Sequence, residues 1–374
     1  MSEKLIASKS ERLVSLDVFR GITIAGMVLV NNPGSWSHLY HPLGHAHWNG
    51  WTPTDLIFPF FLFIVGVAMT FSFTKRRARG QSRVRLFEQV CRRTIILFML
   101  GLILDGFFHW RLIAPYIGVI VGLGLLFTHE PPFQIGKTPK QKITKLAAWI
   151  ILAASVIFFI ADFQYFQTAD HIMRIPGVLQ RIALCYFFAS IIMFFSGTRG
   201  RLLWAAGLVI FYWIVMKTVH PPGGFTADVT SAEGLLNEWI DVKILGNHLY
   251  SHRPDPEGLL STIPAISTTL IGILCGDWLH SKREKLDKLS GMFFMGNILI
   301  FAGICMDYWF PINKKIWTSS YVVFTGGMAL IFLSMCFYMI DVKGYKKWSF
   351  PFLVFGTNPI FIFFASGILA RIMY

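Results

Sequence analysis

Long apolar runs are the feature that most constrains this chain, because a helix needs about 20 mostly apolar residues to cross a bilayer. Charged residues make up only 14% of the chain, whereas water-soluble proteins carry roughly 25%. The sequence therefore predicts an all-α polytopic membrane protein and excludes a soluble enzyme, a disordered chain and a coiled coil. About eleven transmembrane helices are expected, over residues 18–35, 55–74, 94–110, 112–128, 145–162, 178–196, 202–219, 258–279, 289–309, 317–340 and 349–372.

The loops between these runs alternate in charge. One set of loops contains 24 lysines and arginines and the other set contains 8, with Arg20 and Arg181 inside apolar runs. Positively charged loops stay in the cytoplasm, so we expect a cytoplasmic N-terminus and a C-terminus on the outer side. Membrane topology explains the net charge of +14, and no nucleic-acid partner is needed. The pattern contains no linker, which predicts a single domain over 1–374 whose longest outer loop is 220–257.

The segment between the first two runs holds a dense group of polar side chains. It contains His38, His41, His45 and His47. Three interpretations compete: an aromatic interfacial belt with solvated histidines, a Zn²⁺ or Cu²⁺ site, and a neutral imidazole that acts as a general base. Asn31 or Asp55 would orient that base. The carboxylate of Asp55 favours a functional interpretation, because intramembrane carboxylates are costly and usually face a cavity.

Charged residues inside the apolar runs are candidate anion partners. Asp17 and Arg20 are three residues apart and form a same-face pair on a helix, which leaves a structural anchor or an anion-binding arginine as alternatives. Arg181 needs a buried partner or an anionic ligand. Helix packing and capping is the alternative for the other polar groups at helix ends, which include Glu257, Lys314, Ser319 and Asn358, the last preceding Pro359.

Six motifs occur in order along the chain. They are RLVSLDVFRGITIAGMVLVNN, HAHWNGWTPTDLIFPFFLFIVG, RIPGVLQRIALCYF, DPEGLLSTIPAI, NKKIWTSSYV and FGTNPIFIF. With these motifs nearly the whole chain resembles the heparan-alpha-glucosaminide N-acetyltransferase family, in particular its shorter bacterial members. The resemblance implies a multi-pass acyltransferase of the bacterial inner membrane, with a periplasmic C-terminus. Such an enzyme moves acetyl from cytosolic acetyl-CoA to the amine of a glucosamine-type sugar across the bilayer.

The resemblance also implies roles for individual residues. The family's catalytic histidine matches His45, its active-site asparagine matches Asn31, and the aspartate ten residues after the histidine matches Asp55. We expect the acceptor to contact Trp48, Asn49 and Glu257. We expect no metal, and a homodimer is a possible assembly. Donor binding is assigned to Asp17, Arg20, Gln180, Arg181, Lys314, Ser319 and Asn358.

Several alternatives stay open at this point. A sugar or solute transporter would also use buried charges and helices broken at Pro59 and Pro359, although transporters usually show internal repeats and none is visible here. A histidine base serves a hydroxyl acceptor as well as an amine, so O-acylation of a cell-envelope glycan remains an alternative. The reaction can pass through a ternary complex or through an acetyl-histidine intermediate. Residues 112–162 resemble an insertion relative to longer family members.

Overall fold

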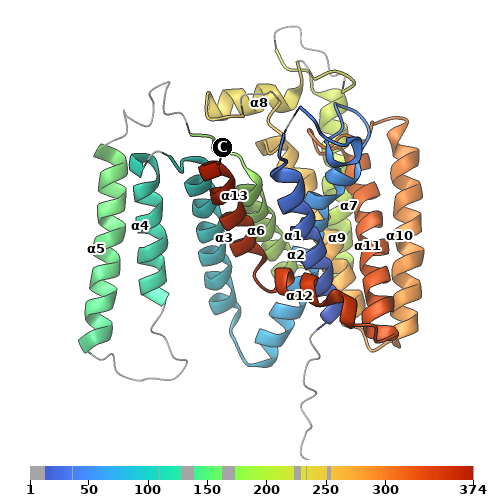
Figure 1. Ribbon diagram of the computed structural model, residues 1–374, viewed down its shortest axis with the longest axis horizontal. Coiled ribbons are helices and arrows are strands. Elements are labelled where there is room, and N and C mark those ends of the chain that lie inside the picture. Colours follow the sequence, from blue (N-terminus) through green and yellow to red (C-terminus); the bar gives the residue numbers. More distant parts are fainter. Residues whose placement is uncertain are drawn as a thin grey trace, which may run out of the picture.

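Helices form the whole secondary structure of the residues that the computed structural model describes, namely 13–35, 37–108, 110–127, 139–161, 173–222, 229–232, 234–250 and 254–373. Most of the long helices run side by side (Figure 1). This confirms the predicted all-α class. In chain order the helices are α1 (Val14–Asn31), α2 (Pro53–Ala78), α3 (Arg83–Asp105), α4 (Trp110–Phe127), α5 (Pro139–Ala161), α6 (Val178–Phe195), α7 (Thr198–Thr218), α8 (Leu236–Leu245), α9 (Leu259–Leu279), α10 (Lys285–Asp307), α11 (Ser319–Phe337), α12 (Phe350–Thr357) and α13 (Pro359–Met373).

Membrane-spanning length and composition are met by eight of these helices, and one bent pair makes a ninth candidate. The predicted multi-pass character is therefore confirmed, but the count of eleven is not. The predicted spans 94–110 and 112–128 do not meet the length and composition of a membrane-spanning helix, for physical reasons. Arg92 and Arg93 lie in the middle of α3, and the apolar part of α4 covers only Ile113–Leu126.

The last apolar run consists of two helices. α12 and α13 meet at Asn358 and are bent by 75° relative to each other. The ring of Pro359 cannot continue a helix through this point. The hydroxyl of Thr357 donates to the carbonyl oxygen of Val354 at 2.7 Å. Figure 1 shows α12 lying across the bundle and α13 running back from it. Pro59, by contrast, lies inside the continuous helix α2, so the expected break at that position is wrong.

The helices α2 and α9 form the centre of the bundle. A Cβ atom on Gly66 would lie 2.0 Å from the carbonyl oxygen of Thr269, and one on Gly272 would lie 2.0 Å from that of Phe63. The two backbones therefore touch only because these positions lack side chains, as is common between membrane helices. This contact holds α2 rigidly, and the first turn of α2 carries Asp55.

The helices α4 and α5 form a hairpin at the edge of the bundle (Figure 1). They cover most of the stretch 112–162, which the sequence alone suggested to be an insertion. The outward side of α5 exposes Ile143, Leu146, Trp149 and Ile150. Such an apolar surface suits contact with lipid.

The helix α8 lies in the segment that was predicted only as a loop, residues 220–257. It crosses one end of the bundle (Figure 1). Asn237 donates to the hydroxyl of Tyr212 at 2.9 Å, and Asp241 accepts from the backbone N–H of Leu259 at 2.8 Å. The second contact caps the start of α9. Burial raises the pKa of the Asp241 carboxyl to about 6.

Candidate active site

The first turn of α2 positions Asp55, the aspartate of the candidate site. Thr52 and Asp55 form a capping box, and Pro53 occupies the first helical position. One carboxylate oxygen of Asp55 accepts from the backbone N–H of Thr52 at 3.0 Å and from that of Ala46 at 3.1 Å. The second bond ties the preceding loop to the helix. The capping sequence therefore fixes both Asp55 and the backbone next to His45.

His45 and Asp55 form a hydrogen-bonded pair. His45 Nδ1 lies 2.7 Å from the other carboxylate oxygen of Asp55, whose side chain is 1% exposed while that of His45 is 45% exposed. The Tyr321 hydroxyl donates to the backbone carbonyl of Asp55 at 2.5 Å. A carboxylate only accepts hydrogen bonds, so it holds the proton on Nδ1 and leaves Nε2 as a base.

Lys314 completes this group from a distant part of the chain. Its Nζ lies 3.0 Å from Nδ1 and 3.2 Å from Nε2 of His45, and 3.6 Å from the carboxylate of Asp55. Lys314 belongs to the loop between α10 and α11, where Asn313 donates to the side-chain oxygen of Asn49 at 3.2 Å. Burial lowers the pKa of the Lys314 ammonium, and the carboxylates of Asp55 and Glu257 oppose that change. The predicted donor ligand Lys314 thus lies beside the predicted catalytic histidine.

These three side chains line a cavity of about 530 Å³, which we call the histidine cavity. Its wall also contains Asn31, Trp48, Arg174, Tyr250, Glu257 and Lys315. The predicted acceptor ligand Glu257 lies 2.6 Å from the guanidinium of Arg174, which also contacts Asp255 at 2.5 Å. The two carboxylates raise the pKa of Arg174. The wall of this cavity therefore also contains the ion pair of Arg174 and Glu257.

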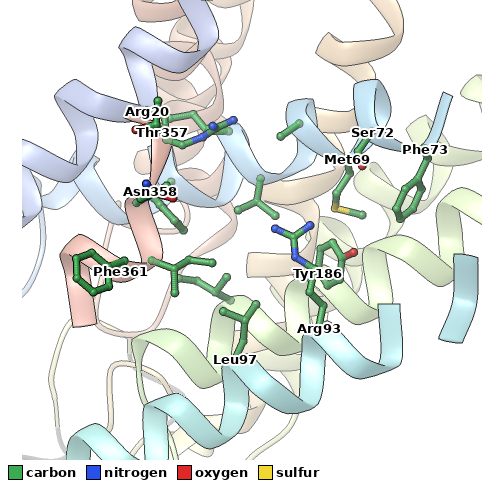
Figure 2. A pocket seen from close by; sticks show the side chains of 17 residues that line it. Arg20, Met69, Ser72, Phe73, Arg93, Leu97, Tyr186, Thr357, Asn358 and Phe361 are labelled. Carbon is green, nitrogen blue, oxygen red and sulfur yellow. The ribbon is translucent and has the colours of Figure 1, made fainter. Parts of the chain in front are cut away.

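A second cavity, of about 360 Å³, contains Arg20 and Arg93, and we call it the arginine cavity. Figure 2 shows Arg20 near Thr357 and Asn358 on one side of the cavity, and Arg93 with Tyr186 on the other side. The guanidinium of Arg93 lies 5.4 Å from the centre of the Tyr186 ring. Arg20 is paired with Asp17 at 3.0 Å, as their spacing predicts. The sequence interpretation missed Arg93, because it lies among many other basic residues at one side of the bundle.

The two cavities follow one another along the same helices. On α2 the histidine cavity is lined from Thr54 to Phe58 and the arginine cavity from Phe61 to Phe73. Asp55 and Phe73 are 18 residues apart on this helix, which corresponds to about 27 Å. That length is close to the roughly 30 Å of a bilayer's hydrocarbon core.

The remaining predicted donor residues lie elsewhere. Gln180 lines a third cavity, of about 250 Å³, which lies between the ends of α1, α3, α6 and α13. Arg181 is buried, contacts the Ser261 hydroxyl and lies 5.1 Å from the Trp317 ring. The hydroxyl of Ser319 donates to the Val209 carbonyl at 2.7 Å. In the described ranges, neither Arg181 nor Ser319 lines any of the three cavities. The structure thus gives both residues contacts within the protein, because they face neighbouring helices.

The histidine segment was also considered as a metal site. Among the described residues, no three His, Cys, Asp or Glu side chains come together to hold an ion. His38 contacts the hydroxyl of Ser37 at 2.9 Å. Among the four histidines of the segment, all within the described range 37–108, His45 is the one that contacts Asp55. The geometry of the described residues therefore favours the interpretation as a general base.

Comparison with known proteins supports the family resemblance that the sequence motifs suggest. The profile of the family described as "Heparan-alpha-glucosaminide N-acetyltransferase, catalytic" matches residues 12–112, which include Asn31, His45 and Asp55. The chain is 25% identical over 413 residues to the Mus musculus protein named heparan-alpha-glucosaminide N-acetyltransferase, covering 97% of the chain and 54% of that protein. For the Homo sapiens protein of the same name the identity is 26% over 403 residues, covering 94% and 52%. The chain spans about half the length of these curated relatives, and the family resemblance inferred from its motifs is confirmed.

Proposed function

We propose that this chain is a transmembrane acetyltransferase, which moves the acetyl group of acetyl-CoA onto the amine of a glucosamine-type sugar. The observation that carries the proposal is the cluster of His45, Asp55 and Lys314 in one cavity, with a second cavity that contains two arginines farther along α2. Amide formation from a thioester requires a base that accepts the proton of the amine and a group, such as a cation, that stabilises the oxyanion. The names of the relatives supply the acceptor class.

The proposed reaction uses each member of the cluster. Nε2 of His45 takes a proton from the acceptor amine as its nitrogen attacks the thioester carbonyl carbon. The ammonium of Lys314, 3.2 Å from Nε2, and the amide of Asn31 stabilise the oxyanion that develops. The intermediate collapses, the carbon–sulfur bond breaks, and the imidazolium returns its proton to the departing thiolate. Asp55 holds the imidazole in place and stabilises its charged form.

The cavities suit a donor with a charged head and a long uncharged arm. Coenzyme A has such a shape, with phosphate groups at one end and the thioester at the other. Arg20 and Arg93 would bind its phosphates, because guanidinium groups pair well with phosphate oxygens. The arm would then run along α2 toward His45. The excess of lysine and arginine at the arginine end supports a cytoplasmic position for that end, in a bacterial inner membrane with the acceptor on the periplasmic side.

Reconstituted vesicles test the proposed function. With labelled acetyl-CoA sealed inside and glucosamine outside, we expect N-acetylglucosamine to appear outside while coenzyme A stays inside. The physical reason is that donor and acceptor reach His45 from opposite ends of the bundle. Vesicles containing the His45→Ala variant serve as the control. Uptake of unmodified glucosamine without acetylation would instead support the transporter alternative.

The donor site gives a second prediction. Arg93→Ala should weaken the binding of coenzyme A by about 10- to 100-fold, because one charge-assisted contact contributes roughly 1.5–3 kcal/mol. Isothermal titration calorimetry in detergent measures this change. Arg283→Ala is the matched control, since Arg283 packs against Trp278 and lines neither of the two cavities. Equal losses in the two variants would mean that the arginine cavity is not the phosphate site.

A further inference from the structure

Lys314 is a primary amine beside the proposed base of a reaction on primary amines. Its side chain is 17% exposed, and it lines the histidine cavity together with His45 and Asp55. Its Nζ atom lies 3.2 Å from Nε2 of His45, which is within the distance over which a base takes a proton. The sugar acceptor of the proposed function offers the same functional group. Lys314 therefore meets the geometric requirement for an acceptor as well as that for a stabilising cation.

A constrained loop holds the backbone of Lys314. Its carbonyl oxygen accepts from the backbone N–H of Trp317 at 3.1 Å, and Trp317 has a positive φ of 51°, which is rare for a bulky residue. The side chain of Trp317 is fully buried and packs against Phe58 and Tyr321. Such strain persists only where the surrounding packing enforces it, commonly at functional sites. The loop thus fixes the backbone from which the amine reaches the imidazole.

The ammonium of Lys314 lies where it can lose its proton. Burial lowers its pKa, whereas the carboxylates of Asp55, 3.6 Å away, and of Glu257 oppose that change. Buried lysines change their protonation state readily and act as nucleophiles once they are neutral. In the proposed reaction the charged form stabilises the oxyanion, whereas the neutral form has a free electron pair. Which amine is acetylated then depends on whether a sugar is present.

We infer that Lys314 is a modification site: when acetyl-CoA is bound and no acceptor is present, the protein acetylates Lys314 and thereby inactivates itself. This inference rests on the proposed function, which supplies the donor. The neutral Nζ attacks the thioester carbonyl carbon, a carbon–nitrogen bond forms, and Nε2 of His45 takes the proton that the nitrogen loses. The carbon–sulfur bond breaks, and the imidazolium protonates the departing thiolate. The products are Nε-acetylated Lys314 and coenzyme A.

Acetylation of Lys314 changes the histidine cavity in two ways. It converts the cation beside His45 into a neutral amide, which removes one of the groups proposed to stabilise the oxyanion. The added acetyl group also fills part of the space in which the sugar amine would react. A bound sugar prevents the modification, because its amine then takes the place of Nζ at the thioester. The modification thus stops the enzyme when donor is present without acceptor.

Peptide mass spectrometry on the full chain in detergent tests this inference. The wild-type protein is incubated with labelled acetyl-CoA and no acceptor, treated with hydroxylamine, which removes acetyl from imidazoles but not from amines, and digested. We expect acetylation of Lys314 to be faster than that of the exposed Lys217 and Lys243, which report direct chemical acetylation. His45→Ala should slow the modification of Lys314 by about 10²–10⁴-fold and leave that of the two exposed lysines unchanged. Calorimetry with coenzyme A verifies that the variant is folded.

Lys315 is the matched internal control. It lines the same cavity, but its Nζ lies 5.8 Å from the centre of the Trp48 ring, so its acetylation should not depend on His45. Excess glucosamine during the incubation should suppress the modification of Lys314. The loss of transfer activity should follow the acetylated fraction of Lys314. Lys314→Gln, whose side chain resembles acetyl-lysine, should have the same residual kcat as the fully modified wild type, about 10²–10³-fold below the unmodified protein.

Two results would overturn the inference. One is acetylation of Lys314 that is no faster than that of Lys217 and Lys243, and the other is acetylation of Lys314 that is as fast in His45→Ala as in the wild type. Transfer to glucosamine without modification of Lys314 refutes this inference alone. Modification of Lys314 without transfer to glucosamine supports the inference and refutes the sugar as the acceptor. If neither amine is acetylated, both proposals fail.

Discussion

Replacing His45 by alanine should abolish acetyl transfer while leaving the binding of acetyl-CoA nearly intact. In the proposed reaction the imidazole acts on the amine, whereas the affinity for the donor would come mainly from the arginine cavity. Loss of a general base lowers rates by about 10²–10⁴-fold. A radiolabelled transfer assay measures kcat, and calorimetry with acetyl-CoA measures donor binding on the same preparation.

His47→Ala is the natural control for this experiment. His47 lines the same cavity, but the hydrogen bond to Asp55 belongs to His45, so a much smaller loss is expected. Transfer at the wild-type rate by His45→Ala would refute the assignment. Equal losses at His45 and His47 would favour a shared metal site instead. Label on wild-type protein that hydroxylamine removes, in the absence of an acceptor, would indicate an acetyl-histidine intermediate.

Lys314→Met should lower kcat by about 10²–10³-fold, the usual effect of removing one donor from an oxyanion site. The methionine keeps much of the side-chain volume but removes the cation that lies 3.2 Å from Nε2 of His45. The KM for acetyl-CoA should change little, because Lys314 lies in the histidine cavity rather than in the arginine cavity. Steady-state kinetics with each substrate varied in turn separate these effects.

Two further variants sharpen the test of Lys314. Lys314→Arg retains the positive charge and should keep more activity than the methionine variant. Lys315→Met removes the neighbouring cation, whose Nζ lies 5.8 Å from the Trp48 ring, and should cost less than Lys314→Met. A loss in Lys314→Met that is confined to the KM for acetyl-CoA would return Lys314 to the donor site and refute its role at the oxyanion.

The membrane class and the pairing of His45 with Asp55 were predictable because both depend on short stretches of chain. An apolar run of about 20 residues satisfies its own backbone hydrogen bonds as a helix, whatever surrounds it. Asn31, His45 and Asp55 lie within 25 residues, and a Thr-Pro-x-Asp capping sequence holds two of them together. The number of spans was less predictable. α3 contains charged residues and the apolar part of α4 is short, and the neighbours of these two helices are known only from the packing.

The donor residues show where prediction from sequence ended. A buried arginine is equally compatible with a ligand and with contacts inside the protein. Arg181 packs on Ser261 and Trp317, whereas Arg93, which lies in the middle of α3, lines a cavity. Which of two arginines faces a cavity depends on the rotation of each helix against its neighbours, and residue type carries no such information.

The sequence by itself determined that this chain is helical, that it lies in a membrane with basic loops gathered on one side, and that His45 has a carboxylate within reach. Only the tertiary structure decided that Lys314, 269 residues away from His45, completes that cluster, and that Gln180 faces a cavity of its own. The physical reason is the distance along the chain over which each interaction acts. Hydropathy and capping act over one or two helical turns, whereas these contacts depend on how α6, α11 and the loop before it pack against α1 and α2.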